Sequence, residues 1–359
     1  MSLKRIAELT GTSVSTVSRV LNSSEHRCNQ KGLAERIWKT AEELQYIPNA
    51  SARELRKGIV SKEAPFAVDV LQTRFDSMDK DIFFLEVFHC VIEELMRNGC
   101  ILDQVLNLND IVSLEQEGNT GSIPYRPQGS GLLDKQLNAA VIHRKKNTGL
   151  IVLGKCPAGL FGSLQKRYAY IVGIDRNPTD YEYDEVICNG AAAASMAVEY
   201  LIRLGHTSIA YIGDCNYESR YIGYYQALLN HKIPLRYNNV YQTSQTEQEG
   251  YRVMGEIIRD TVRPTAVFCA NDCTAIGVLK ALRQNKKRGY QPSVISIDNI
   301  LESQKTTPML TTIDIPKKEM VHLAVLLLLD RRAGSHTESI RIELPCRLLE
   351  RESCTYNNG

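Results

Sequence analysis

The sequence predicts an α/β protein with a small helical head at the N-terminus and a larger body of two lobes, each built on a doubly wound parallel sheet. A chain of 359 residues is too long for one small core, which suggests two or three domains. Apolar residues recur at helical spacing up to residue 44, whereas strand-like and helix-like runs alternate from residue 66 onward. Hydrophobic residues make up 43% and charged residues 23%, as in soluble globular proteins.

Three short helices are expected in the head. Apolar residues at helical spacing begin at Leu3, and Gly11 ends that helix. Ser13 is a suitable N-cap for a second helix, because its hydroxyl can accept a hydrogen bond from a free backbone N–H. A third helix is expected over about residues 33–44. Two short helices around a tight turn, braced by a third, describe a helix-turn-helix, although helical spacing alone also fits a small bundle with no nucleic-acid role.

In the body, short apolar runs bounded by turn residues predict strands, and longer amphipathic runs predict helices. The predicted strands are 66–71, 101–106, 150–153, 170–174, 185–188, 209–212, 266–269 and 294–297. Helices are expected at 82–98, at 132–145, up to residue 204 and between the later strands. Residues 109–131, rich in Gly, Ser and Pro, are expected to form a surface loop. This alternation favours parallel sheets with helices on both faces.

The charge is unevenly distributed along the chain. The net charge is +2, but residues 1–58 hold ten Lys and Arg against six Asp and Glu, and the remaining residues have a net charge of −2. A basic head on a slightly acidic body indicates that the head binds a polyanion.

The cysteines and apolar runs favour a reducing, aqueous compartment. The ten cysteines are scattered without a CxxC pair, which is typical of free thiols and not of a disulfide scaffold. Charged residues interrupt the first apolar run, so no signal peptide is expected, and the longest apolar run, 323–329, is too short to span a membrane. A cytoplasmic protein is expected.

No catalytic, metal or cofactor site is expected. None of the seven histidines lies in an HExxH or nucleophile–base setting, and neither a GxxxxGK[ST] nor a GxGxxG loop is present. Asp76, Asp79 and Asp81 alternate as in a calcium loop, but its glycine and glutamate are missing. The sequence therefore argues against an enzyme.

Two strings in the head, GTSVSTVSRVLN and ELQYIPNASARELRKG, resemble the DNA-binding head of the lactose-repressor (LacI-type) family almost position by position. Strings in the body, among them EYLIRLGHTSIAYIGD, FCANDCTAIGVLKAL and TPMLTTIDIPKKEM, resemble that family's effector domain, which shares its fold with periplasmic sugar-binding proteins. The resemblance covers nearly the whole chain and is weakest between residues 72 and 147. It implies a DNA-binding head at 1–58 that includes a hinge helix at about 49–57. Residues 59–359 would then form a two-lobed, periplasmic-binding-protein-like domain for effector binding and dimerisation.

In the head, the resemblance implies that the second helix lies in the DNA major groove. Val14 and Ser15 would reach base edges, through a thymine methyl and one modest hydrogen bond. The hinge helix would enter the minor groove, where Leu55 would wedge between base pairs and kink the duplex. The expected DNA-contacting residues are Ser13, Val14, Ser15, Thr16, Ser18, Arg19, Asn22, Asn49, Ala52, Arg53, Leu55 and Arg56.

In the body, the resemblance and the chemistry of sugar hydroxyls select the same polar groups at strand ends. Arg220 offers a fork of donors, Asn271 a donor and an acceptor, and Asp298 an acceptor for two hydroxyls. Asn271 could instead serve only as a helix cap, and Asp272 is expected to cap the following helix. Phe83 and Phe84 match a position where an aromatic side chain lines the cleft, and one of the two is expected in the core.

Two departures from the family pattern narrow the ligand. Gln245 stands five residues before Gly250, where the family usually has an aromatic residue that stacks on the ligand, and Asn189 stands where an acidic residue is common. A small sugar or sugar phosphate is therefore favoured over a stacked purine.

Together these features predict a homodimeric transcriptional repressor in the bacterial cytoplasm, associated with the nucleoid. It would bind double-stranded operator DNA and be released by a carbohydrate effector, without membrane contact. The alternatives are a solute-binding protein with no regulatory role, and a regulator controlled by a protein corepressor.

Overall fold

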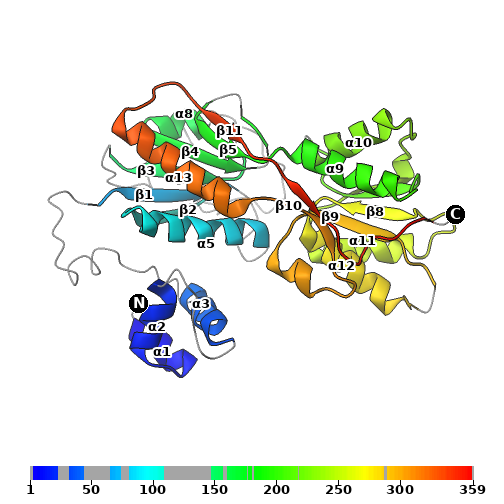
Figure 1. The fold of residues 1–359 in the computed structure, drawn as a ribbon, viewed down its shortest axis with the longest axis horizontal. Coiled ribbons are helices and arrows are strands. Elements are labelled where there is room, and N and C mark those ends of the chain that lie inside the picture. Colours follow the sequence, from blue (N-terminus) through cyan, green and yellow to red (C-terminus); the bar gives the residue numbers. More distant parts are fainter. Residues whose placement is uncertain are drawn as a thin grey trace, which may run out of the picture.

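The computed structural model describes most of the chain and has both the helical head and the two-lobed α/β body (Figure 1). The described residues are 3–22, 32–43, 65–73, 81–108, 147–156, 160–175, 177–179, 182–216, 218–286 and 289–357. The expected hinge helix at 49–57, the boundary at residue 58, the loop at 109–131 and the helix at 132–145 lie outside the described residues.

The head contains the three expected helices: α1 (Leu3–Thr10), α2 (Val14–Asn22) and α3 (Leu33–Glu43). They pack around the fully buried side chains of Ile6, Val17 and Ile37. Gly11 has a positive φ of 65°, which suits glycine and ends α1 where the sequence predicts it. The head therefore has its own small core.

In the N-terminal lobe, a six-stranded parallel sheet has the order β11-β5-β4-β3-β1-β2. Its strands are β1 (Ala67–Gln72), β2 (Ile101–Asn107), β3 (Gly149–Leu153), β4 (Tyr170–Asp175), β5 (Asp184–Ile187) and β11 (Arg341–Glu343). Helices α5 (Ile82–Arg97) and α13 (Lys317–Ala333) pack on one face, and α8 (Leu160–Gln165) packs on the other. Strands buried on both faces explain the continuous apolar runs of the sequence.

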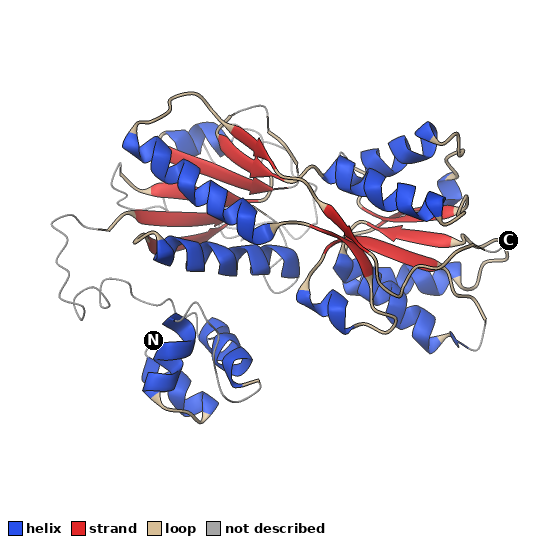
Figure 2. Cartoon of the chain, in the orientation of Figure 1, coloured by secondary structure: helices blue, strands red, loops and turns tan. Residues whose placement is uncertain are grey.

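The C-terminal lobe repeats this architecture with strand order β12-β10-β9-β8-β6-β7, in which only β12 is antiparallel to its neighbour. Its strands are β6 (Ile209–Gly213), β7 (Val240–Gln242), β8 (Ala266–Cys269), β9 (Ser293–Asp298), β10 (Thr311–Asp314) and β12 (Arg347–Leu349). Helices α9 (Gly190–Arg203) and α10 (Ser219–Asn230) cover one face, and α11 (Glu247–Ile257) and α12 (Asp272–Gln284) cover the other. The 3-10 helices are η2 (Tyr237–Asn239) and η4 (Leu301–Lys305). Figure 2 shows each sheet between helical layers.

Within the described residues, the chain passes between the lobes three times. These crossover segments are residues 188–189, between β5 and α9, residues 315–316, between β10 and α13, and residues 344–346, between β11 and β12. The backbone N–H of Leu344 donates to the carbonyl of Ile187 at 2.9 Å, so two of the three crossover segments run side by side at the hinge. Figure 1 shows the red C-terminal segment passing from one lobe to the other.

Every strand predicted from the sequence is present within one or two residues, but the sequence did not predict β7, β10, β11, β12 or α8. Most of these are three- or four-residue strands at or near sheet edges, where strand periodicity is too short to detect. Among the described residues, no helix combines the length and apolar character needed to cross a bilayer.

Candidate functional site

The start of α2 presents an exposed polar surface. The Ser13 hydroxyl accepts a hydrogen bond from the backbone N–H of Thr16 at 3.1 Å, so Ser13 caps α2 as expected. Its oxygen also lies 2.8 Å from the hydroxyls of Ser15 and Thr16. Val14 is 43% exposed, and Ser15 is exposed as well. The first turn of α2 therefore offers its side chains and free backbone N–H groups to an outside partner.

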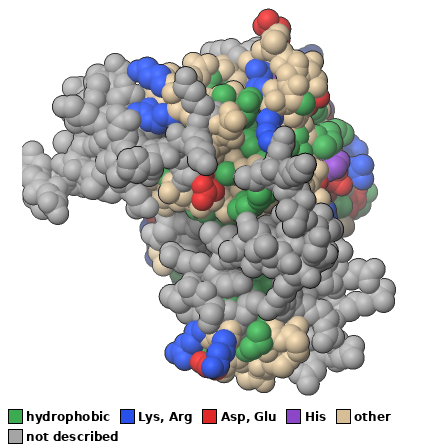
Figure 3. Space-filling model, turned by 90° about the vertical axis from the view of Figure 1, so that its left-hand side faces the viewer, with side chains coloured by type: hydrophobic (Ala, Val, Ile, Leu, Met, Phe, Trp, Pro, Cys, Tyr) green, Lys and Arg blue, Asp and Glu red, His purple; other side chains and the backbone are tan. Residues whose placement is uncertain are grey.

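For some of the other expected DNA-contacting residues, the structure describes the backbone alone. Ser18, Arg19 and Asn22 lie on α2, but their side chains are outside what the structure describes. Asn49, Ala52, Arg53, Leu55 and Arg56 lie outside the described residues altogether. The described surface of the head carries exposed basic side chains, including Lys4, Arg5, Arg36 and Lys39. Figure 3 shows basic side chains grouped at the bottom of the view.

In the C-terminal lobe, Arg220 lies at the start of α10 and is only 1% exposed. Its Nε donates to the carboxylate of Glu218 at 2.8 Å, one terminal nitrogen donates to the carbonyl of Ala270 at 2.8 Å, and the other donates to Oε1 of Gln245 at 2.8 Å. A guanidinium has five N–H donors. Among the described residues three are occupied, which leaves two N–H groups for a ligand.

Gln245 thus has a definite role at the position where the family usually has an aromatic residue. Its side-chain oxygen holds Arg220, and its backbone carbonyl accepts from the Asn271 side chain at 3.0 Å. Its φ of 62° lies in the left-handed region, which costs free energy for a residue other than glycine. The sequence showed that the usual aromatic residue is replaced here, but it could not show that Gln245 would join two predicted ligand contacts.

Asn271 is the N-cap of α12. Its Oδ1 accepts from the backbone N–H and the hydroxyl of Thr274, at 2.9 and 2.7 Å. The alternative of a helix cap is therefore real, and the cap leaves the side-chain amide directed at the backbone of Gln245.

The expectation that Asp272 caps α12 is wrong, because Asn271 occupies that position and Asp272 is the first helical residue. The Asp272 carboxylate is fully buried and accepts from the hydroxyls of Ser296 and Thr312 and from the backbone N–H of Ile300. Burial, together with the charge of Asp298, raises the pKa of Asp272 to about 7. This residue joins α12 to β9 and β10 beneath the site.

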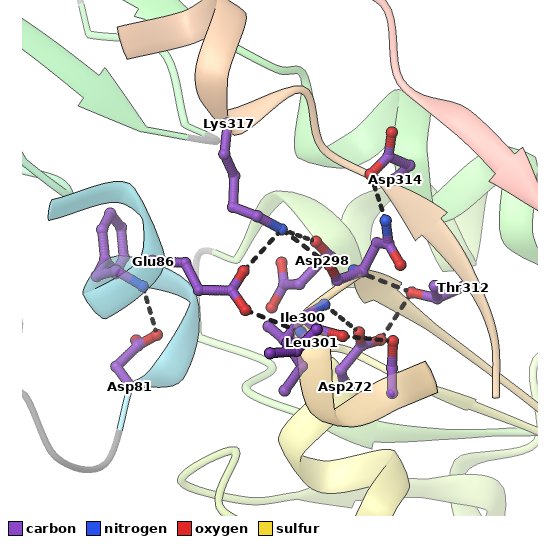
Figure 4. A network of polar contacts seen from close by, with 12 residues as sticks. Asp81, Glu86, Asp272, Asp298, Ile300, Leu301, Thr312, Asp314 and Lys317 are labelled. Carbon is purple, nitrogen blue, oxygen red and sulfur yellow. Dashed lines mark hydrogen bonds and ion pairs between the residues drawn. The ribbon is translucent and has the colours of Figure 1, made fainter. Parts of the chain in front are cut away.

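Asp298 ends β9 and is buried. It has a φ of 121° and Asn299 a φ of 48°, so the chain turns sharply in an unfavourable conformation at the strand end. The Nζ of Lys317 donates to the backbone carbonyls of both residues, at 2.6 and 3.0 Å. These bonds hold the turn in place (Figure 4).

Lys317 also reaches the N-terminal lobe. Its Nζ lies 3.2 Å from Oε2 of Glu86 on α5 and 5.4 Å from the ring centroid of Phe83. The other Glu86 oxygen accepts from the backbone N–H of Leu301 at 2.8 Å. Figure 4 shows Glu86 and Lys317 reaching toward the Asp298 turn from elements of the N-terminal lobe. Neither residue was predicted from the sequence, since this contact depends on how the lobes meet.

Phe83 and Phe84 are both buried and lie edge to face, with ring centroids 5.1 Å apart. One core residue was expected, and the structure buries both. Phe83 faces Lys317, so it is the residue closer to the Asp298 turn.

Arg220 keeps its charge although its side chain is buried. Burial alone would lower the pKa of Arg220, but the Glu218 carboxylate outweighs it, and the pKa is raised. Arg220 therefore stays charged, and the carboxylates of Glu218 and Asp298 both favour its charged form. A cavity of about 530 Å³ is lined by residues that include Ile82, Thr246 and Cys273, but Arg220, Asn271 and Asp298 do not line it. The described residues contain no group of His, Cys, Asp and Glu arranged to hold a metal ion.

Two family models match the chain. The model described as bacterial regulatory proteins, lacI family, matches residues 2–49, and the periplasmic binding protein-like domain matches residues 198–354. The chain is 29% identical to the HTH-type transcriptional repressor PurR of Yersinia pestis bv. Antiqua, over 98% of this chain and 96% of that protein.

Solved structures show the same fold. The transcriptional regulator CelR in complex with cellobiose has a TM-score of 0.65 at 21% identity and covers 99% of this chain and 100% of its own. The Lac repressor dimer bound to operator and the anti-inducer ONPF has a TM-score of 0.63 at 20% identity, with 99% of each chain covered. Residues 2–49 therefore match a lacI-family DNA-binding domain and residues 198–354 a periplasmic binding protein-like domain, which is the organisation of a DNA-binding regulator of transcription.

Proposed function

We propose that the protein is a homodimeric repressor in the bacterial cytoplasm, which leaves its operator when a small sugar or sugar phosphate binds between the two lobes. The observation that carries this proposal is the buried cluster of Arg220, Gln245, Asn271 and Asp298, to which Lys317 and Glu86 connect the other lobe. The names of the relatives support it: one is a repressor, one binds cellobiose, and one is a dimer on its operator.

The ligand would form hydrogen bonds with the polar groups of the cluster. Two N–H groups of Arg220 suit two neighbouring oxygens, and the Asp298 carboxylate suits one or two hydroxyls. Phe83 and Phe84 would supply the apolar wall. Because Gln245 replaces an aromatic residue, the ligand would be held by hydrogen bonds and not by stacking.

On DNA, two copies of α2 would lie in successive major grooves, about 34 Å apart. Ser13, Val14, Ser15, Thr16, Ser18, Arg19 and Asn22 would contact bases and phosphates there, and Asn49, Ala52, Arg53, Leu55 and Arg56 would contact the minor groove. In this proposal residues 1–58 are the DNA-binding head, and residues 59–359 bind the effector and the second copy. Closure of the cleft would move the N-terminal lobes and separate the two heads.

The proposal is tested in two steps with the full chain. First, selection from random duplexes identifies the bound sequence, and a two-fold symmetric site is expected. Second, calorimetry with cellobiose, ribose and their phosphates is compared for the wild type, Arg220→Ala and Asp298→Asn. Sugar binding should be lost in both variants, whereas Arg252→Ala, an exposed arginine of the same lobe, should bind normally. If no sugar changes operator affinity, control by a protein corepressor becomes the better explanation.

Leu55→Ala separates the two activities. It should weaken operator binding, because the minor-groove wedge is removed, while sugar binding stays unchanged. Gel-shift titration and calorimetry on the same preparation measure both. Equal operator affinity in the variant and the wild type would refute the wedge.

A further inference from the structure

Two cysteines lie on adjacent crossover segments at the hinge. Cys188 directly follows β5, and Cys346 directly precedes β12, so each is in a segment that joins the two lobes. Strand pairing between β5 and β11 continues to the hydrogen bond between Leu344 and Ile187. Pro345 then interrupts the ladder, because proline has no backbone N–H to donate.

The two side chains are in contact. The Cys188 thiol is hydrogen-bonded to the sulfur of Cys346, and this bond, which opposes the effect of burial, lowers the pKa of the Cys346 thiol. A lowered pKa raises the fraction of thiolate, which is the nucleophilic form. Cys188 is fully buried and Cys346 is half-buried, so Cys346 is the sulfur that a small reagent reaches first.

Two other thiols of the described chain, Cys215 and Cys354, have a raised pKa and lie outside the crossover segments. Burial raises the pKa of Cys215, and its thiol donates to the carbonyl of Gly213 at 3.9 Å. Cys354, on the C-terminal segment, bonds to the carbonyl of Val294, and its burial raises its pKa to about 12. The pair of Cys188 and Cys346 is therefore distinguished by both its chemistry and its place at the hinge.

We propose that Cys188 and Cys346 are a redox modification site: a hydroperoxide converts them to a disulfide that joins two of the three crossover segments and restrains the motion of the lobes. The Cys346 thiolate attacks one oxygen of the peroxide, the O–O bond breaks, and a sulfenic acid and hydroxide form. The Cys188 thiol then attacks the Cys346 sulfur, the S–S bond forms, the S–O bond breaks, and water leaves with the Cys188 proton. Two thiols and one hydrogen peroxide give one disulfide and two waters, and a dithiol reverses the reaction.

A restraint at the hinge would limit the motion of one lobe relative to the other. Rotation of one lobe against the other bends the crossover segments, and a covalent bond between segments 188–189 and 344–346 limits how far these two can move relative to each other. The disulfide itself does not depend on the proposed repressor function; only its consequence for operator release rests on that function.

The test uses the full chain treated with hydrogen peroxide, with free thiols then blocked before digestion with trypsin. The cleavage sites place Cys188 and Cys346 on separate peptides, NPTDYEYDEVICNGAAAASMAVEYLIR and IELPCR. We expect a cross-linked pair of these peptides, which dithiothreitol releases. The cross-link should be lost in Cys346→Ser and in Cys188→Ala, and it should remain in Cys215→Ser.

Amide hydrogen exchange tests the restraint without DNA or sugar. The third crossover segment, 315–316, is not cross-linked itself, so slower exchange in its peptide on oxidation reports a change in lobe motion. The slowing should occur in the wild type and in Cys215→Ser but not in Cys346→Ser. Oxidation of Cys346 to a sulfinic acid without a cross-link would overturn the disulfide, and a cross-link with unchanged exchange would overturn the restraint. Failure of operator binding in the reduced protein would instead count against the proposed function alone.

Discussion

Asp272 shows how one buried carboxyl connects the site to the sheet beneath it. It accepts hydrogen bonds from β9, from β10 and from the turn after Asp298, and it has no exposed surface. Its pKa is raised to about 7 by burial and by the nearby Asp298 charge. Between about pH 4 and pH 7, Asp272 is therefore mostly protonated in the folded protein but ionised in the unfolded chain.

This shift makes the stability of the folded protein depend on pH. Because the folded pKa lies above the unfolded value, the contribution of Asp272 is fully present below about pH 4 and is lost as pH rises to about 7. Each pKa unit corresponds to about 1.4 kcal/mol, so the loss is at most a few kcal/mol.

Asp272→Asn should remove this pH dependence. Urea unfolding at about pH 5 and about pH 8 should show that the wild type loses stability relative to the variant at the higher pH. Asp260→Asn, at an exposed carboxylate of the same lobe, is the control. An equal difference at both pH values would show that Asp272 is ionised in the folded protein.

At the scale of elements, α11 and α12 approach each other so closely that only glycine fits at the contact. A Cβ at Gly277 would lie 1.9 Å from the carbonyl oxygen of Glu247, and one at Gly250 would lie 2.1 Å from that of Thr274. Backbone atoms cannot yield as a flexible side chain can. The two glycines therefore fix the distance between the helices, and with it the position of Asn271 at the start of α12 and of Gln245 before α11.

Gly277→Ala should separate these helices and destabilise the lobe by about 1–3 kcal/mol, the usual cost of overpacking. Gly255→Ala, also on α11, is the matched control, because its Cβ would meet nothing within 4 Å. That control should be neutral or more stable by about 0.5–1 kcal/mol, since alanine is favoured over glycine in helices. Denaturant titration measures the free energy of unfolding of both variants. If Gly277→Ala were as stable as Gly255→Ala, the helices could move apart without cost.

At the scale of the whole molecule, Lys317 holds the two lobes together at the site. It is 12% exposed and joins the carbonyls of the Asp298 turn to Glu86 on α5. The cation lies at the start of α13, directly after the crossover at 315–316. A ligand that displaces or strengthens these bonds would change how the lobes meet.

Lys317→Met should break this connection and leave Glu86 and two carbonyls without their cation. Since such groups are partly buried, the expected loss is about 1–3 kcal/mol. Lys318→Met, at the exposed neighbouring position, should have no comparable effect. Thermal unfolding of the two variants is the measurement, and identical midpoints would show that Lys317 does not couple the lobes.

Local features were predictable from the sequence, and features that need a distant partner were not. The Ser13 cap, the break at Gly11 and the long parallel strands follow from residues that lie close together in the chain. Asn271 and Asp272 are both good helix caps, and nothing in the sequence decided between them. The bond between Arg220 and Gln245 spans 25 residues and arises only when α10 meets the connection between β7 and α11 in the fold. The resemblance to a family predicted Arg220, Asn271 and Asp298 as ligand contacts, and these stay predictions; it did not point to Lys317 or Glu86.

The three crossovers also set an order in which the chain can mature during its synthesis. The N-terminal lobe begins first, but α13 and β11 complete it only after the C-terminal lobe has been made. Until residues 317–343 leave the ribosome, β5 lacks a neighbour on one side and the face later covered by α13 stays open to water. The segment from α9 to β10, in contrast, is continuous and lacks only the short strand β12. The lobe synthesised second is therefore the one able to fold first, and an exposed sheet edge in the earlier lobe is the point at which a nascent chain would need protection from aggregation.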